Sequence, residues 1–331
     1  MKNKFQSLFF ITFISCGGFS LFGSNIIMKL FPNSGYLVLL LMLPITILIA
    51  FLLSKKKILI KDIIHSPFLR IILLIYLIAS GFFTFYSFLS VINDLYYPLT
   101  SRIVIFLIIL LVCNFLATYG INNIVKVGFV VVILTILIYS LTIFSDTKYD
   151  FTLLKYSNFA ISEPLFLFSF LFIFLDGFLL IIFLPSKQPS FKKCFLYILF
   201  VTLITSFFIL ENYLFYPSSY FIQHNYPYLL KYFTYKNKTF LEHLDISYLV
   251  CITIFTIFHY SIQIEIFRIL LKKTRKSKIP LLISAIIFLI FIFTDHLYIK
   301  TTWIGYFMLG LSGLLLLFFA IILLKRKRLK C

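Results

Sequence analysis

Ten long apolar runs constrain the fold of this chain more than any other feature of its sequence. Each run is about as long as the 17–25 residues that a helix needs to cross a bilayer. The runs cover approximately residues 5–30, 34–53, 69–92, 102–119, 123–144, 161–184, 192–215, 244–270, 279–294 and 300–324. Only 12% of the residues are charged, against about a quarter in soluble domains. The sequence therefore predicts an all-α integral membrane protein with ten transmembrane helices, in which residues 1–331 form a single polytopic domain.

The distribution of charge predicts the orientation of these spans. The net charge is +19, and 22 of the 30 basic residues fall on one side of the membrane if the spans alternate from the N-terminus. Loops rich in Lys and Arg stay in the cytoplasm, so both termini are expected there. The basic residues then face anionic lipid, and we expect no nucleic acid partner.

Two of the runs contain residues that interrupt a membrane helix. In the first run, residues 15–20 read SCGGFS, and in the sixth run Asp176 and Gly177 lie near the middle. Irregular backbone in a membrane is tolerated where it faces protein or a cavity, and a carboxylate at the bilayer centre costs roughly 2.5–3.5 kcal/mol on insertion scales. Two structural alternatives remain open. The glycines of the first run would also allow close helix packing, and Asp176 would also fit a buried helix cap or a protonated carboxyl group.

The spacing of the two interruptions predicts a repeat. Five spans separate the first run from the sixth, as expected of a 5+5 inverted-repeat transporter fold with discontinuous first and sixth helices. The exposed N–H groups of a half-helix would bind an anionic group of a ligand. Asp176, or free carbonyl groups near it, would then bind its ammonium group.

Polar residues in other spans complete the candidate site. The eighth run carries Thr256, Tyr260 and Gln263 at helical spacing, which fits a cavity lining and fits hydrogen bonding between helices equally well. The candidate ligand-binding residues are Ser15, Gly17, Gly18, Ser20, Tyr86, Phe172, Asp176, Gly177, Thr256 and Tyr260. Asp176 and His259 are candidates for proton coupling. The sequence contains no pairing of a nucleophile with a base, no phosphate loop and no CxxC, so no catalytic residue, cofactor or metal is expected.

Three segments carry a resemblance to a known family. Residues 97–100, between the third and fourth spans, read YPLT, which is similar to the family's Pro-x-Thr segment. Residues 172–176 read FIFLD, with Pro185 nine residues after the acid, and they look like aromatic-x-x-Gly-Glu before an apolar run that ends in Leu-Pro. The loop before the eighth span contains YP at 226–227 and FLEHLD at 240–245, close to Tyr-Pro and Phe-Leu-Glu-Arg-Leu-Asp. Over nearly its whole length the chain resembles the B-subunit permeases of endospore germinant receptors, in the amino acid–polyamine–organocation superfamily.

The resemblance implies a sensor in the inner membrane of a dormant spore. Such a subunit binds a small germinant, expected to be an amino acid, acts with A and C subunits and triggers germination without covalent chemistry. The sequence departs from the family pattern in three places: Asp176 replaces a usual Glu, Leu175 a frequent Gly and His243 a common Arg. A proton-coupled amino acid transporter with the same fold is the alternative function.

Overall fold

A helix lies in each of the ten ranges that the sequence predicts. The computed structural model describes residues 2–18, 27–28, 31, 35–55, 60–143, 150, 152–153, 168–184, 190–214, 244–271, 279–294 and 301–324. The helices in the predicted ranges are α1 (Lys2–Gly18), α3 (Gly35–Lys55), α5 (Pro67–Leu95), α6 (Arg102–Ala117), α7 (Ile121–Ile143), α9 (Leu171–Phe183), α10 (Phe191–Tyr213), α13 (Leu244–Leu270), α14 (Ile279–Thr294) and α15 (Thr301–Leu324). A short helix that the sequence analysis did not predict, α4 (Ile60–His65), precedes α5.

The length and composition of the helices identify a multi-pass membrane protein. Among the described residues, five helices are long and apolar enough to cross a bilayer: α3, α5, α10, α13 and α15. Helices α6 and α7 pass the same test together, and α1, α9 and α14 contain shorter apolar helical stretches. The chain is therefore an all-helical protein that crosses a membrane several times.

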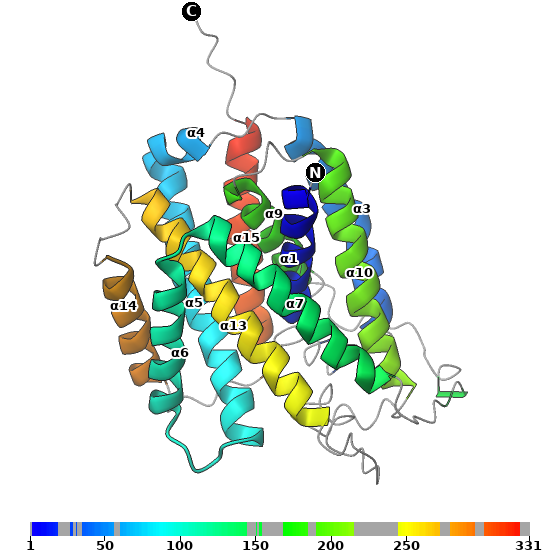
Figure 1. Cartoon of the computed structure of the whole chain (residues 1–331). Coiled ribbons are helices and arrows are strands. Elements are labelled where there is room, and N and C mark those ends of the chain that lie inside the picture. Colours follow the sequence, from blue (N-terminus) through cyan, green and yellow to red (C-terminus); the bar gives the residue numbers. More distant parts are fainter. Residues whose placement is uncertain are drawn as a thin grey trace, which may run out of the picture.

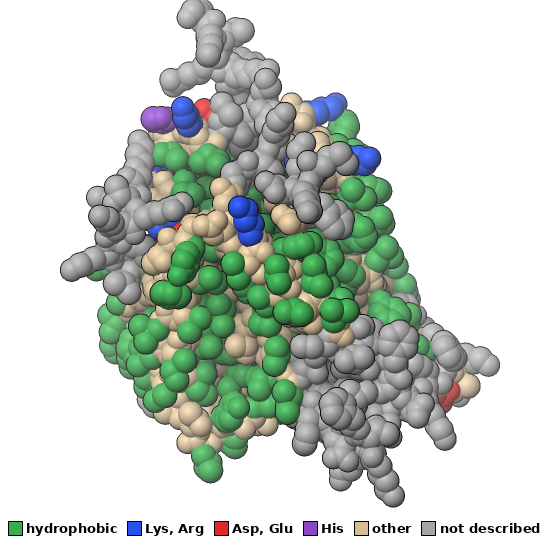
Figure 2. All heavy atoms as spheres, in the orientation of Figure 1, with side chains coloured by type: hydrophobic (Ala, Val, Ile, Leu, Met, Phe, Trp, Pro, Cys, Tyr) green, Lys and Arg blue, Asp and Glu red, His purple; other side chains and the backbone are tan. Residues whose placement is uncertain are grey.

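The surface of the bundle supports this assignment. Large apolar side chains such as Leu111, Phe115 and Phe293 are 64–81% exposed, which is costly in water and favourable against lipid. In Figure 2 apolar side chains cover the middle of the visible face, and Lys and Arg side chains gather toward its upper end. Helix α1 begins and α15 ends at this same upper end (Figure 1).

The bundle is organised around two long helices and two short ones. The longest helices, α5 and α13, pack against each other near the centre. Helix α5 also packs against α6, α14 and α15, whereas α13 packs against α14, α6 and α7. The short helices α1 and α9 contact each other, and each packs against α10. This arrangement brings the first and sixth predicted spans together in the protein interior.

The sixth helix differs from the prediction. Helix α9 runs without a break through Asp176 and Gly177, and a single 3-10 turn (Phe168–Phe170) precedes it. The expected discontinuity at Asp176–Gly177 is therefore wrong. Glycine lowers the cost of leaving helical geometry but does not require it, and here the whole of α9 is buried against neighbours that support a regular helix. In the first span, α1 extends through Ser15, Gly17 and Gly18, while Ser20 lies outside the described residues.

A sharp bend joins the fourth and fifth predicted spans. The axes of α6 and α7 differ by 119° across the short connection between Ala117 and Ile121. Gly120 in this connection has φ of 82°, a left-handed conformation that strains a residue with a Cβ. The glycine therefore allows the chain to reverse within three residues.

Candidate functional site

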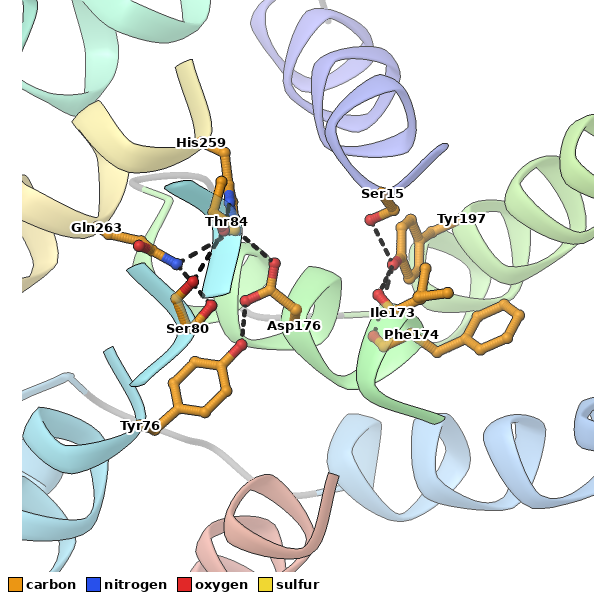
Figure 3. Close-up of polar contacts among 10 residues, drawn as sticks. All are labelled: Ser15, Tyr76, Ser80, Thr84, Ile173, Phe174, Asp176, Tyr197, His259 and Gln263. Atoms are coloured by element: carbon orange, nitrogen blue, oxygen red, sulfur yellow. Dashed lines mark hydrogen bonds and ion pairs between the residues drawn. The ribbon is translucent and has the colours of Figure 1, made fainter. Parts of the chain in front are cut away.

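The carboxylate of Asp176 lies in the interior of the bundle, where three helices meet. The residue is only 6% exposed and sits on α9 between α5 and α13. Tyr76 of α5 donates a hydrogen bond to its Oδ1 at 2.5 Å, and His259 Nε2 of α13 lies 3.0 Å from its Oδ2 (Figure 3). Hydrogen bonds of this kind stabilise a buried carboxylate. They also link three helices through one side chain.

The His259 side chain has packing and polar contacts around its ring. Its Nδ1 lies 3.3 Å from Thr84 Oγ1 of α5, and its ring stacks on Phe255 with centroids 5.1 Å apart. The amide nitrogen of Gln263 lies 3.3 Å from His259 Nε2 and donates to Ser80 Oγ at 2.9 Å. With His259 1% exposed, this packing fixes the orientation of the ring toward Asp176.

A second cluster connects α1, α9 and α10. The Tyr197 hydroxyl donates to the carbonyl of Ile173 at 3.0 Å and lies 2.7 Å from Ser15 Oγ. Since the phenol proton is used at Ile173, Ser15 is the donor to Tyr197. Gly177 lies directly under the Tyr197 ring, so that a Cβ added at Gly177 would overlap the hydroxyl. The glycine in the sixth span therefore serves close packing, a role that the sequence suggested only for the glycines of the first span.

A small cavity lies between these two clusters. It is lined by Ile14, Ser15, Gly18, Phe172, Ile173, Asp176, Phe255 and His259. The cavity offers about 10 Å³ to the centre of a water-sized molecule, which is room for about one water. Its walls come from the C-terminal end of α1, the N-terminal half of α9 and the middle of α13. The C-terminal end of α1 and the N-terminal half of α9 therefore face the same cavity.

The structure brings some of the predicted site residues to this cavity. Ser15, Gly18, Phe172, Asp176 and His259 line it. Gly17 and Gly177 lie behind it, where they allow Phe255 and Tyr197 to pack closely.

Three predicted residues lie elsewhere among the described residues. Thr256 donates to its own helix at Ile252 O, and Tyr260 packs on the Phe85 ring with its hydroxyl 3.4 Å from Ser284 Oγ. Tyr86 packs against Phe82. These side chains do not line the cavity. The prediction was wrong for them because helical spacing alone does not indicate which side of a buried helix faces a ligand.

The sequence analysis missed Tyr76, Tyr197 and Phe255. Tyrosine and phenylalanine are too frequent in this chain, at 21 and 44 residues, for residue type to single these out. One signal was available, because Tyr76, Ser80 and Thr84 recur every four residues and so share one face of the third span. That face is the one that meets Asp176 and His259.

Comparisons with protein-family models, curated proteins and solved structures find no match to this chain. Within the described residues, no three His, Cys, Asp or Glu side chains group as metal ligands would. Of the segments that carry the family resemblance, residues 97–100 form an exposed connection between α5 and α6, and residues 172–176 lie in α9. The third, in the loop before α13, lies outside the described residues up to residue 243.

Replacing Tyr76 with Phe tests the hydrogen bond to Asp176. We expect Tyr76→Phe to lower the free energy of unfolding by about 1–3 kcal/mol, because the variant leaves a buried carboxylate oxygen without its donor. Thermal unfolding of the purified protein in detergent measures this change. Tyr119→Phe is the matched control, since Tyr119 is 47% exposed. Equal stability of both variants would contradict a tight Tyr76–Asp176 hydrogen bond.

Proposed function

We propose that this chain is a ligand-sensing subunit of a germinant receptor in the spore inner membrane, and that it binds a small germinant, an amino acid, and triggers germination. The observation that carries the ligand-binding part of the proposal is the cavity at the meeting of α1, α9 and α13, with the carboxylate of Asp176 in its wall. An intramembrane carboxylate is expensive and marks a binding or coupling site. No covalent chemistry is proposed for it.

The ends of the helices around the cavity suit a zwitterion. The N-terminal end of α9 carries a partial positive charge and the C-terminal end of α1 a partial negative charge. Phe172 and Ile173 are among the first residues of α9, and Gly18 is the last of α1. A ligand carboxylate near α9 and a ligand ammonium near Asp176 would each meet the opposite charge.

The pairing of helices supports a fold of ten spans in two inverted repeats of five. If α1, α3, α5, α6 and α7 correspond in order to α9, α10, α13, α14 and α15, most contacts have a counterpart. The contact of α1 with α7 matches that of α9 with α15, and α13 with α6 matches α5 with α14. Likewise α13 with α7 matches α5 with α15, and α1 with α10 matches α9 with α3. With ten spans, the distribution of Lys and Arg supports both termini in the cytoplasm, next to anionic lipid.

The receptor assignment rests on the family resemblance described above, which also supplies the A and C subunits as proposed partners. Occupancy of the site would shift a two-state bundle toward the conformation that binds the ligand better. The A and C subunits would then couple this conformational change to the start of germination.

Germination of spores that lack this chain tests the proposal directly. We expect these spores to lose their response to at least one of the twenty amino acids and to regain it when the intact gene is returned. Normal germination with every amino acid in the absence of the chain would refute the receptor function.

The second candidate function is a proton-coupled amino acid transporter. The contact between Asp176 and His259 in the cavity wall favours it, since such pairs carry protons in transporters. A measurement of amino acid flux across a membrane distinguishes the transporter from the receptor. Accumulation of a labelled amino acid in proteoliposomes that contain this chain alone would establish transport, whereas binding without accumulation would leave the receptor.

A further inference from the structure

The two oxygens of the Asp176 carboxylate have different partners. Tyr76 occupies one oxygen and His259 the other. Because a carboxylate oxygen can accept more than one hydrogen bond, an ammonium group that enters the cavity joins these two partners or displaces one of them. Tyr76 does not line the cavity, but His259 does. His259 is thus the partner that an entering ligand meets.

The hydrogen bonds around His259 fix the number of protons on the pair. The hydroxyl proton of Thr84 is used in a bond to Ser80 O at 2.8 Å, so the Thr84 oxygen can only accept from His259 Nδ1. With a proton on Nδ1, one further proton lies between His259 Nε2 and Asp176 Oδ2. The pair is then either imidazolium with carboxylate or neutral imidazole with carboxylic acid. In both arrangements the one hydrogen-bonding position of Nε2 is used toward Asp176, so the Gln263 nitrogen only contacts Nε2 and donates to Ser80.

In both arrangements the pair has no net charge, as a site within a membrane requires. The neighbouring groups that titrate are phenols and thiols, which are neutral at physiological pH: Tyr76 of α5, Tyr197 and Cys194 of α10, and Cys16 of α1. They add no charge to the pair.

The remaining buried charges of the described residues lie farther along the helices. Glu265 and Arg268 form an ion pair with each other on α13, and Glu265 is six residues from His259, or about 9 Å of helix. Glu211 on α10 is fourteen residues from Tyr197, or about 21 Å. No described lysine or arginine lines the cavity.

We propose that the ammonium group of the ligand replaces the shared proton of Asp176 and His259, so that binding releases one proton to water. The ammonium pairs with the Asp176 carboxylate, and His259 remains as a neutral imidazole with its proton on Nδ1. A protonated His259 would face the ammonium as a like charge, which disfavours keeping the proton. The charge is balanced, because one positive charge enters and one leaves.

The size of the cavity agrees with this exchange. It has room for about one water, and an ammonium head group is similar in size to a water molecule. Phe172 and Phe255 are among the apolar residues that line it. The site therefore recognises a primary ammonium first, with the rest of the ligand reaching toward the ends of α1 and α9.

This inference deepens the proposed ligand site and rests on it, but it has its own test. The probe is methylammonium, added to the full chain in nanodiscs at matched pH. A pH-indicator dye in weak buffer should report about one proton released per methylammonium bound. The apparent affinity should rise about tenfold for each pH unit, because proton release favours binding at higher pH. Acetate, which lacks the ammonium group, should neither bind nor release protons.

His259→Gln locates the source of the proton. The introduced amide can donate to Asp176 beside Tyr76, and two donors keep the carboxylate ionised, so methylammonium should bind with little proton release and a flat pH dependence. His65→Gln is the matched control, since His65 is exposed on α4, and it should keep the slope of the intact chain.

Three outcomes would overturn the exchange. They are no binding of methylammonium, binding without proton release by the intact chain, and an unchanged slope in His259→Gln. The first two need only the intact chain, so they do not depend on how well a variant folds. Failure of the receptor function looks different, because methylammonium would still release protons while spores that lack the chain germinate normally with every amino acid.

Discussion

Under the proposed receptor function, Asp176→Asn should abolish the response to the ligand while leaving a stable protein in the membrane. The ligand loses an ammonium–carboxylate pair in a low-dielectric site, where leaving one charge unpaired costs about 3–5 kcal/mol. The expected loss of affinity is therefore at least about 100-fold. Ligand titration of the purified chain measures the affinity, and germination of spores that carry the variant measures the response.

Stability should survive because the amide reproduces the hydrogen bonds of the carboxyl group. The amide oxygen accepts from Tyr76, and the amide nitrogen donates to Nε2 of a neutral His259 that keeps its proton for Thr84. Asp62→Asn, on the exposed face of α4, is the matched control and should bind normally. An Asp176→Asn protein with intact response would remove Asp176 from the ligand site. Loss of the folded protein would instead show that the charge of Asp176 holds the helices together.

The helices of this protein follow from local properties of the sequence, whereas its breaks do not. The run at residues 69–92 predicts α5 within three residues at each end, because apolar length alone decides whether a segment can cross a membrane. The continuity of α9 at Asp176–Gly177 could not be predicted this way. Here α9 is buried along its whole length, and the Tyr197 ring from α10 packs closely against Gly177, a tertiary contact that leaves no local pattern.

The candidate site was predictable where a residue is rare in its surroundings. Asp176 stands out as an acid deep within a span, and His259 as an imidazole among apolar residues. Tyr76 and Tyr197 share their type with many lipid-facing and loop residues, so only the packing of α5, α9 and α10 distinguishes them. To predict that Asp176 and His259 are in contact, one would need to know how α9 and α13 are placed along each other. That placement depends on tertiary packing and cannot be read from the sequence of either helix alone.

The close approach of Gly177 and Tyr197 predicts a large loss of stability when Gly177 gains a side chain. We expect Gly177→Ala to lower the free energy of unfolding by about 1–3 kcal/mol, the usual cost of overpacking. The added methyl group would overlap the Tyr197 hydroxyl and ring. Relief requires Tyr197 to move, which breaks its bonds to Ser15 and Ile173. Since Ser15 lines the cavity, ligand affinity should fall together with stability.

Gly310→Ala is a control that differs only in its surroundings. Gly310 lies within α15, and a Cβ added there meets nothing within 4 Å. Alanine has the higher helix propensity, so this variant should be neutral or more stable by about 0.5–1 kcal/mol. Thermal unfolding in the same detergent compares the two. If Gly177→Ala were as stable as Gly310→Ala, the α9–α10 contact would be loose, and Tyr197 would not fix the position of Ser15 at the cavity.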